Sequence, residues 1–348
     1  MLTVLKGPCS VYTGYGKLFL DLASRLRERM PVEILAMDNE VPADYPLPIT
    51  QVSRGIQFGL FVGPANRIGQ LTTHYRVLYT MCEVSNLPRS WQLDLHIANE
   101  VWVPTTFCRD VFLEYCRPRV VRVGYNENLY CRQDWTEEDR ASFWRLCCPE
   151  ALGKRVIGTA GVLSPRKGID VLLHTWERLA PTNAVLVCKA RDSGYTGVIR
   201  NDLKTPPAGV YVLDENWPEE RMAGFYRSLD LLVLPTRAEG LCLPPLECAA
   251  CGTPALVTRA CGPADYIDDR GIYGLEVRGM SPVRNMTAHD AYWYEPDAFD
   301  LADKLTAWIE QPPQVEHRYR QWSMGELIGT FETELEAAQK RAMEARRR

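Results

Sequence analysis

The chain has 348 residues, of which 46% are hydrophobic and 24% are charged, and its formal net charge is −4. This balance is typical of a soluble globular protein of about two ordinary domains. It counts against a protein that binds nucleic acid mainly through phosphates, which would be basic. No apolar stretch approaches the roughly 20 residues of a membrane span.

The chain ends and the cysteines indicate where the protein works. The first ten residues lack a charged segment followed by an apolar segment and a cleavage site, so we expect a cytoplasmic protein. Its twelve cysteines are then expected to be reduced, and the pair Cys248 and Cys251 to pack inside a helix rather than hold a metal. The basic tail Lys340–Arg348 suits the end of a helix, and a nucleic-acid or membrane contact through it remains open.

Short apolar runs alternate with helical segments along the first half. We expect strands at Thr3–Leu5, Val32–Met37, Gln57–Val62, Arg76–Thr80, Glu100–Val103 and Val120–Val123. Helices are expected at Gly16–Met30, Trp91–Ala98 and Thr105–Cys116. This alternation predicts a parallel sheet that is covered by helices on both faces.

A second series of the same kind follows a polar, tryptophan-rich segment. Its expected strands are Arg155–Thr159, Ala184–Cys188, Gly209–Leu213, Leu231–Leu234 and Ala255–Val257. Its expected helices are Gly168–Leu179, Glu219–Ser228 and Pro244–Cys251. We therefore expect one domain over residues 1–150 and another over 151–323, with a last helix near 324–345 that packs back on the first domain.

Two such domains place the carboxyl ends of two sheets around a cleft, where ligands bind in doubly wound folds. The segment after Leu231–Leu234 is the strongest candidate for a site. Glu239 and Gly240 lie on its loop, and Glu247 lies early in the next helix, near an N-terminus suited to an anion such as a diphosphate. A carboxylate there can accept hydrogen bonds from the paired hydroxyls of a ribose.

A diphosphate also needs positive charge, which carboxylates cannot supply. Arg166 and Lys167 follow the first strand of the second series and could clamp a diphosphate and stabilise a leaving nucleotide. Lys189 ends another strand and could join them. Each of these charged residues could instead be an ordinary surface residue.

At this point the sequence resembles a known family. Thr236–Pro254 resembles the E-x7-E signature of retaining glycosyltransferases of family 4, and Pro165–Asp170 resembles the lysine-glycine turn of that family. Tyr79–Val84, Glu100–Thr105 and the glycine loop Thr13–Gly16 resemble segments of its N-terminal domain. The resemblance implies the α/β GT-B fold, with two doubly wound Rossmann-like domains facing a central cleft.

The resemblance also implies roles for individual residues. Glu247 would bind the ribose, Glu239 would contact the transferred sugar, and Gly240 and Leu241 would offer it backbone N–H groups. Lys167 with Arg166 would hold the diphosphate.

Further donor contacts are implied for Gly14 and Gly16, near the phosphates. The donor would be a UDP or GDP sugar, and the reaction would retain configuration without a metal or other cofactor. Val162 stands where the family often has an arginine.

Other assignments are less specific. Asn216 and Trp217 are expected near the nucleobase. Glu83 is expected either to face the acceptor or to be structural, and neither His74 nor His96 is assigned to catalysis. The acceptor could be a glycan, a lipid, a protein or a modified nucleic-acid base.

Three alternatives remain. Gly14 and Gly16, with Asp38 about 20 residues on, partly match the fingerprint of a dinucleotide-dependent oxidoreductase, but Phe19 replaces its third glycine. A metal-dependent, single-domain transferase would need acidic ligands such as those at Asp38–Glu40. A non-catalytic protein that binds nucleotide sugars or glycans would tolerate loss of the basic residues that this chain carries.

Overall fold

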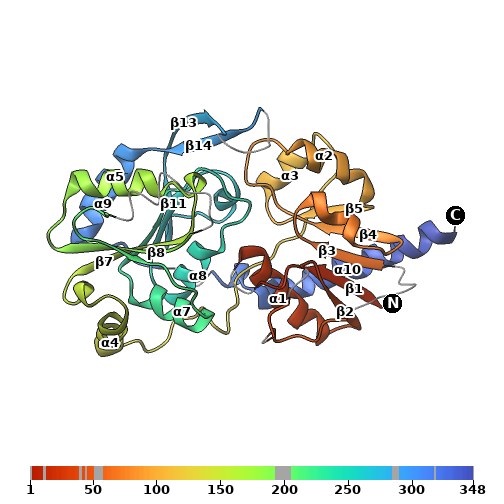
Figure 1. Cartoon of the computed structure of the whole chain (residues 1–348), viewed down its shortest axis with the longest axis horizontal. Helices are drawn as coiled ribbons and strands as arrows, with labels where there is room; N and C mark the ends of the chain where they lie inside the picture. The colour runs from red at the N-terminus through yellow and green to blue at the C-terminus, as the bar shows by residue number, and fades with distance from the viewer. Residues whose placement is uncertain are drawn as a thin grey trace. The chain divides into compact units, whose positions relative to one another are not determined.

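The computed structural model describes residues 2–10, 13–38, 41–43, 45–50, 58–192, 205–283, 290–316 and 319–347. The chain divides into two compact units (Figure 1). The first comprises Met1–Asn126, Val283–Ala291 and Gln321–Arg348, and the second comprises Glu127–Pro282 and Tyr292–Arg320.

The first unit contains a six-stranded sheet whose described strands all run parallel, in the order β2-β1-β3-β4-β5-β6. The strands are β1 (Thr3–Gly7), β2 (Val32–Ala36), β3 (Phe58–Val62), β4 (Tyr75–Tyr79), β5 (Glu100–Val103) and β6 (Arg119–Val120). The helices are α1 (Gly14–Arg27), α2 (Arg89–Asp94), α3 (Thr106–Phe112) and α10 (Met324–Arg347), with 3-10 turns at Ala65–Gln70 and Leu95–Ile97.

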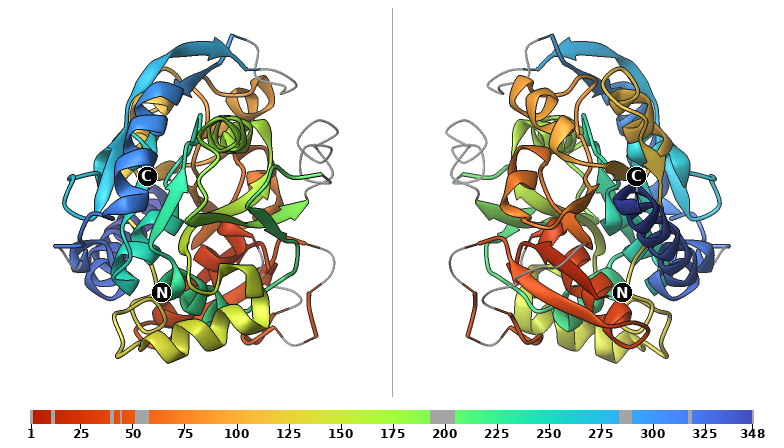
Figure 2. Two further views of the ribbon diagram at one scale, coloured as in Figure 1. Left: turned by 90° about the vertical axis from the view of Figure 1, so that its left-hand side faces the viewer. Right: turned by 90° about the vertical axis from the view of Figure 1, so that its right-hand side faces the viewer.

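Helix α10 belongs to the first unit although it ends the chain. The ring of Phe331 packs against Tyr79 and Trp102, with ring centres 5.7 and 5.6 Å apart. Further along the helix, the Arg341 guanidinium donates to both carboxylate oxygens of Glu100 at 2.8 and 2.9 Å. These contacts fix the helix, dark blue in the right panel of Figure 2, to this sheet.

The second unit contains another six-stranded parallel sheet, in the order β12-β11-β10-β7-β8-β9. Its strands are β7 (Arg155–Leu163), β8 (Ala184–Asp192), β9 (Val210–Leu213), β10 (Leu231–Leu234), β11 (Ala255–Thr258) and β12 (Ile272–Leu275). Its helices are α4 (Glu137–Cys147), α5 (Ile169–Leu179), α7 (Glu219–Ser228), α8 (Leu243–Cys251) and α9 (Ala298–Glu310). An antiparallel hairpin is formed by β13 (Val277–Pro282) and β14 (Tyr292–Pro296).

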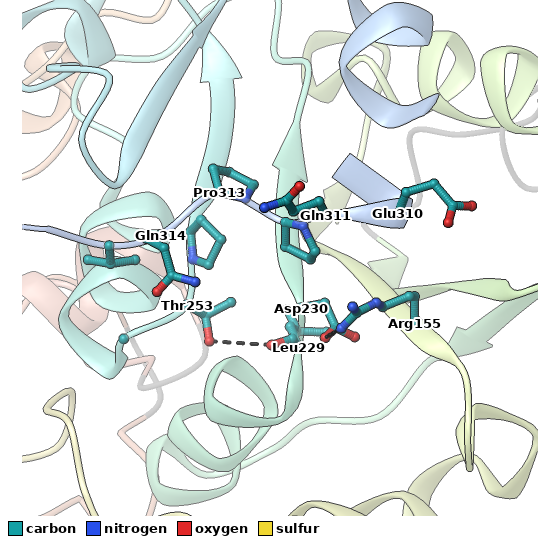
Figure 3. Close-up of a pocket in the computed structure, with 12 residues that line it drawn as sticks. Arg155, Leu229, Asp230, Thr253, Glu310, Gln311, Pro313 and Gln314 are labelled. Carbon is teal, nitrogen blue, oxygen red and sulfur yellow. Dashed lines mark hydrogen bonds and ion pairs between the residues drawn. The ribbon is translucent and has the colours of Figure 1, made fainter. Parts of the chain in front are cut away.

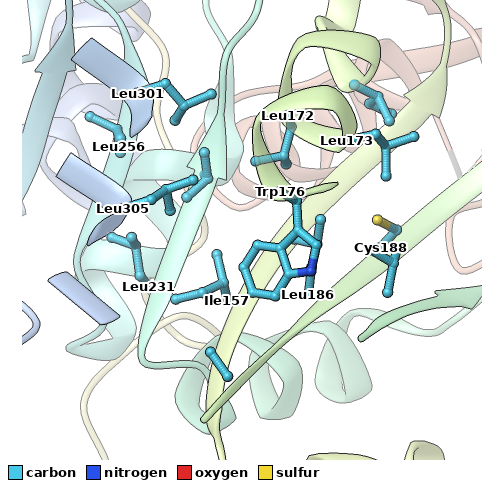
Figure 4. Close-up of a cluster of buried hydrophobic side chains, with 14 of the residues drawn as sticks. Ile157, Leu172, Leu173, Trp176, Leu186, Cys188, Leu231, Leu256, Leu301 and Leu305 are labelled. Carbon is cyan, nitrogen blue, oxygen red and sulfur yellow. The ribbon is translucent and has the colours of Figure 1, made fainter. Parts of the chain in front are cut away.

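The core of this unit explains its layers. Alternate residues of each buried strand point to opposite faces of the sheet. On one face, side chains of α5 and α9 such as Trp176 and Leu305 pack on Ile157, Leu186 and Leu231 (Figure 4). Helices α7 and α8 contact each other on the opposite side (Figure 1).

The second unit begins at Glu127 and not near residue 150 as expected. The polar segment that suggested a break contains α4, yellow in Figure 2, which packs on α7. The indole N–H of Trp144 donates to the Ser228 carbonyl oxygen at 3.0 Å, and Arg140 pairs with Asp230 through its two terminal guanidinium nitrogens. A buried tryptophan and an ion pair therefore fix this segment to the second sheet.

The predicted class, two doubly wound α/β domains, is confirmed by these two parallel sheets. The single-domain alternative is wrong for the same reason. Of the residues Asp38–Glu40 on which it rested, Asn39 and Glu40 lie outside the described residues. Asp38 accepts a hydrogen bond from the backbone N–H of Cys9 at 3.2 Å.

Candidate active site

The candidate site lies at the carboxyl ends of two neighbouring strands of the second sheet. Strands β7 and β10 pair in parallel, with Leu231 opposite Ile157. Arg166 and Lys167 follow β7 in a short 3-10 turn, Pro165–Lys167, and Glu239 follows β10. Because both strands end at the same edge of the sheet, their loops meet there, as the sequence predicted.

Glu239 has both cations as ion-pair partners. The Nζ atom of Lys167 lies 2.6 Å from Oε1 of Glu239, and a guanidinium nitrogen of Arg166 lies 2.9 Å from Oε2. The three side chains are 15%, 17% and 5% exposed for Lys167, Arg166 and Glu239. Burial alone would raise the pKa of Glu239, but Lys167 and Arg166 lower it below its ordinary value. The carboxylate is therefore ionised, and two cations surround one anion.

The turn that carries the cations depends on Gly168. Its φ of +65° is left-handed, and a Cβ atom there would lie 1.8 Å from the carbonyl oxygen of Pro235. Only glycine allows this close approach of the turn to the end of β10. Gly168 also precedes α5, so the turn and the helix start are fixed together.

Glu247, the second glutamate of the Glu239–Glu247 pair, is buried on α8. The hydroxyl of Tyr226, on α7, lies 3.1 Å from Oε2 of Glu247. Burial, and next the negative charge of Glu247, raise the pKa of Tyr226 well above its ordinary value. The phenol therefore stays protonated and donates a hydrogen bond to the carboxylate. The carboxylate is thereby oriented from the neighbouring helix.

The start of α8 differs from the expectation in one respect. The helix begins at Leu243, one residue before the expected Pro244, and both Pro244 and Pro245 stand in its first turn as expected and supply no N–H group. Cys242, before it, has a left-handed φ of +65°, and its carbonyl oxygen accepts the Tyr266 hydroxyl at 2.7 Å. The two prolines limit the number of N–H groups at this helix end that could attract an anion.

Gly240 and Leu241 are buried in the loop between β10 and α8. The loop is tied down from Gly262, whose N–H donates to the Glu239 carbonyl oxygen at 2.9 Å. A Cβ atom on Gly262 would lie 2.3 Å from the Gly240 carbonyl oxygen, so this contact also requires glycine.

Lys189 is directed elsewhere than expected. Its Nζ donates to the Glu215 carbonyl oxygen at 2.5 Å and lies 5.0 Å from the centre of the Trp217 ring. Trp217 is buried, also stacks with Arg221 at 4.1 Å, and donates to the Glu215 carboxylate at 2.7 Å. Its neighbour Asn216 is exposed. Lys189 and Trp217 thus belong to a packed cation–aromatic cluster.

The candidate residues of the first unit lie at the start of α1 and just after β4. Gly14 and Gly16 begin α1, and Thr13 caps that helix by accepting the Gly16 N–H at 3.1 Å. A Cβ atom on Gly16 would lie 1.8 Å from the Ser10 carbonyl oxygen, whereas Gly14 has open space. Glu83, half-buried, follows β4.

The histidines and cysteines that the structure describes add no further residue to the candidate site. His74 and His96 are both exposed. Within the described ranges there is no group of three or more potential metal-ligating side chains, and no helix combines the length and apolar character needed to cross a membrane. Cys248 and Cys251 are buried, and burial raises the pKa of each thiol.

A cavity of about 360 Å³ opens at the opposite edge of the second sheet (Figure 3). It lies where β7, β10 and β11 begin, next to Arg155, Asp230 and Thr253. Two pairs of its lining residues bond to each other: Arg155 with Asp230 at 3.1 Å, and the Thr253 hydroxyl with the Leu229 carbonyl oxygen at 3.5 Å. It contains none of the residues predicted to form the site.

Two residues of the site were not assigned from sequence. Arg237 lies within the quoted Thr236–Pro254 segment, and its position directly after a buried strand could have drawn attention. Tyr226 gave no signal, because a tyrosine inside an amphipathic helix is ordinarily a packing residue.

Known proteins resemble this chain at two levels, the sequence of its second unit and the fold of both units. Residues 154–306 match the model of a family described as Glycosyl transferases group 1. The chain is 32% identical over 145 residues to D-inositol 3-phosphate glycosyltransferase from Corynebacterium jeikeium, covering 37% of this chain and 32% of that protein. It is 29% identical over 178 residues to the enzyme of the same name from Streptosporangium roseum, covering 48% and 39%. The chain therefore spans well under half the length of these relatives.

Solved structures resemble nearly the whole chain in fold. HepE from Anabaena, in complex with UDP and glucose, superposes with a TM-score of 0.74 at 13% identity over 97% of this chain and 100% of HepE. Sucrose-phosphate synthase from Thermosynechococcus elongatus gives 0.71 at 14% identity, with coverage of 97% and 100%. A glycosyltransferase from Rickettsia africae gives 0.74 at 12% identity, with coverage of 97% and 98%. This likeness shows the fold, and it confirms the predicted GT-B class.

Proposed function

We propose that this protein is a glycosyltransferase that moves a sugar from a nucleoside-diphosphate sugar to an acceptor hydroxyl, with retention of configuration and without a metal. The observation that carries the proposal is the buried cluster of Lys167, Arg166 and Glu239 at the carboxyl ends of β7 and β10. The match of residues 154–306 to group 1 glycosyltransferases supports it, because that segment contains all three residues.

The positive residues have the leaving group as their natural partner. A departing nucleoside diphosphate gains negative charge as the glycosidic bond breaks. Lys167 offers a compact ammonium and Arg166 a planar fork of N–H donors, and both suit phosphate oxygens. Fixed cations that are already desolvated stabilise such charge more than they would in water. This is why the proposal needs no metal ion.

Glu239 is proposed to act on the sugar rather than as a base. Since Lys167 and Arg166 lower its pKa, the carboxylate is a weak proton acceptor. Its negative charge is suited to hydrogen bonds from sugar hydroxyls and to positive charge that develops at the anomeric carbon. As the bond from the anomeric carbon to the diphosphate oxygen breaks, the acceptor hydroxyl attacks from the same face and gives its proton to the departing phosphate oxygen, which retains configuration without a covalent intermediate.

The remaining donor contacts follow from the same segment. Glu247, oriented by Tyr226, is proposed to bind the ribose hydroxyls, and Gly240 and Leu241 to hold the sugar through backbone N–H groups. Gly14 and Gly16 are proposed to contact the donor phosphates, and Glu83 to contact the acceptor.

A UDP sugar is the first donor to test, because HepE has been solved with UDP-glucose. The acceptor is proposed to be a hydroxyl compound, and the protein to act in the cytoplasm.

A thermal-shift screen with UDP, GDP, ADP and their sugars tests the proposal. A ligand present at 100 times its dissociation constant stabilises the protein that binds it by about 2.7 kcal/mol. We expect a rise in melting temperature with one of these nucleotides, and release of free nucleotide from its sugar when an acceptor is present. No shift with any of them overturns the proposal. Binding without turnover across a panel of glycan, lipid and protein acceptors favours the non-catalytic alternative.

A further inference from the structure

Arg237 joins the two loops that form the candidate site. Its side chain is 10% exposed and donates to both carboxylate oxygens of Asp170, at 2.7 and 2.8 Å. It also donates to the Pro165 carbonyl oxygen at 2.5 Å, while its backbone N–H donates to the Arg166 carbonyl oxygen at 2.7 Å. Arg237 therefore contacts the segment that carries Lys167 at the first residue of the turn, within the turn and after it.

The same guanidinium also reaches a third element. Its Nε donates to Oε2 of Glu295, on β14, at 2.8 Å, and Oε1 of Glu295 accepts the Ser281 hydroxyl at 2.5 Å. The backbone carbonyl oxygen of Arg237 accepts the Tyr294 N–H at 2.9 Å. The loop after β10 is thus fixed on one side to the turn Pro165–Lys167, here called the cation turn, and on the other to the hairpin β13–β14.

From these contacts we propose that Arg237 is a positioning residue that sets the place of Lys167 and Arg166 relative to Glu239. This inference rests on the proposed function. Arg237 lies two residues before Glu239, so a bond from Arg237 to either end of the cation turn fixes the separation of the two charged groups. Arg237 itself is neutralised by Asp170 and Glu295, so it acts through the turn and not as a further phosphate ligand.

Lysine cannot replace arginine in this arrangement. A guanidinium presents five N–H donors in a rigid plane, which lets one side chain hold a carboxylate with two bonds and reach two further acceptors. An ammonium keeps the charge but cannot span Asp170, Glu295 and Pro165 together. Arg237→Lys therefore removes the geometry and leaves the charge.

Arg259 offers a matched control in the same unit. It also pairs with two acids, Asp269 at 2.6 Å and Glu276 at 3.4 Å, and its side chain is 36% exposed. Its partners lie on loops that carry none of the proposed site residues. Arg259→Lys therefore repeats the chemical change away from the site.

The experiment measures UDP and inorganic pyrophosphate binding, kcat, KM for the donor and melting temperature for wild type, Arg237→Lys and Arg259→Lys. A displacement on the order of 1 Å at a reacting group can cost about 100-fold, so we expect kcat/KM to fall about 10- to 100-fold in Arg237→Lys. Binding of both probes should weaken as well. Arg259→Lys should stay within about twofold of wild type, as substitutions away from a site usually do.

A purely structural role predicts a different pattern, in which both variants melt earlier and bind UDP normally well below their melting temperatures. That result overturns the inference. Asp170→Asn provides a second variant if Arg237→Lys does not fold. It weakens the Arg237–Asp170 ion pair by changing the partner that is more exposed. We expect the same direction of change from it.

Non-additivity provides the sharper test. In a Lys167→Met background, Arg237→Lys should lower kcat/KM by a much smaller factor than it does in wild type. The reason is that the effects of substitutions at two residues are not additive when one residue acts through the other. A full additional loss contradicts the inference. If wild type binds none of UDP, GDP, ADP and pyrophosphate, the proposed function fails, and the inference with it. If wild type binds UDP and Arg237→Lys binds it equally well, only the inference fails.

Discussion

The Nζ atom of Lys167 lies 2.6 Å from Oε1 of Glu239, and both side chains are mostly buried. In the proposed reaction this ammonium also holds a donor phosphate. The Glu239 carboxylate and the phosphate then compete for the N–H donors of Lys167. They also compete for those of Arg166, which pairs with the other carboxylate oxygen of Glu239. Glu239 therefore has two opposing effects, one on the binding of the diphosphate and one on the transfer of the sugar.

Glu239→Gln separates these two effects. The amide cannot pair with Lys167 as a carboxylate does, so UDP should bind as tightly as in wild type or more tightly. Turnover should fall on the order of 100-fold or more, as it does when one group that stabilises transition-state charge is removed. Isothermal titration with UDP and a nucleotide-release assay measure the two quantities.

The matched control is Glu138→Gln, which removes an exposed carboxylate paired with Arg145 on α4. It should change neither UDP affinity nor turnover. Turnover near the wild-type value in Glu239→Gln would contradict the role of Glu239 at the sugar.

Tyr226→Phe should weaken nucleotide binding and spare pyrophosphate binding. The phenol donates to Oε2 of Glu247 at 3.1 Å, and without it the buried carboxylate loses a donor. A hydrogen bond to a charged group contributes about 1.5–3 kcal/mol, and its loss removes the contact that orients the carboxylate toward the ribose, so UDP affinity should fall roughly 10-fold. Since pyrophosphate has no ribose, its affinity should be unchanged.

Tyr273→Phe controls for the loss of a phenol in the same unit, because its hydroxyl donates to the Gln314 carbonyl oxygen at 2.8 Å, outside the site. This variant should bind UDP normally. An equal loss of UDP and pyrophosphate affinity in Tyr226→Phe would show that Glu247 does not act at the ribose.

Much of the second unit could be predicted from its sequence. Short apolar strands separated by amphipathic helices indicate a parallel sheet, and in such a sheet the residues that follow neighbouring strands meet at one edge. This reasoning brought Lys167, Arg166 and Glu239 together before the structure did. It could not give the partners of Lys189, which also follows a strand but points to Trp217 and Glu215.

The prediction of the domain boundary near residue 150 was wrong for a different reason. Helix α4 has a single buried residue, Trp144, so its apolar stripe was too weak to recognise. The signal that was present is local: Thr136 and Asp139 form a capping box at its start. Attention to that cap would have extended the second unit toward Glu127.

Gly168→Ala should destabilise the protein and impair the site together. A left-handed φ costs a non-glycine residue about 1–2 kcal/mol, and here the new Cβ atom would also lie 1.8 Å from the Pro235 carbonyl oxygen. Gly153→Ala separates the two costs, because Gly153 has a φ of +72° but open space around its Cβ position.

Thermal unfolding and UDP titration check both glycine variants. For a unit of this size 1 kcal/mol shifts the melting temperature by about 2–4 °C, so Gly153→Ala should melt a few degrees early and bind UDP normally. Gly168→Ala should melt earlier still and bind UDP more weakly. Equal shifts in the two variants would exclude the backbone contact with Pro235 as a constraint on the cation turn.

The stability of the protein should depend on Glu239 in acid. Burial alone would raise the pKa of this carboxyl, but Lys167 and Arg166 lower it below its ordinary value of 4.5. A group whose pKa is lower in the folded state contributes stability that is complete above its unfolded-state pKa. That stability is lost as the pH falls through the folded-state pKa, because the protonated carboxyl no longer pairs with the two cations.

Urea unfolding of wild type and Glu239→Gln between pH 7 and pH 3 tests this linkage. The difference in free energy of unfolding between the two proteins should be largest near pH 7 and should shrink as the pH falls below the ordinary value of 4.5. Glu138→Gln again supplies the control, since an exposed ion pair contributes little at any pH. A difference for Glu239→Gln that stays constant over this range would mean that the carboxylate contributes no charge-dependent stability, and that Lys167 and Arg166 are held by other contacts.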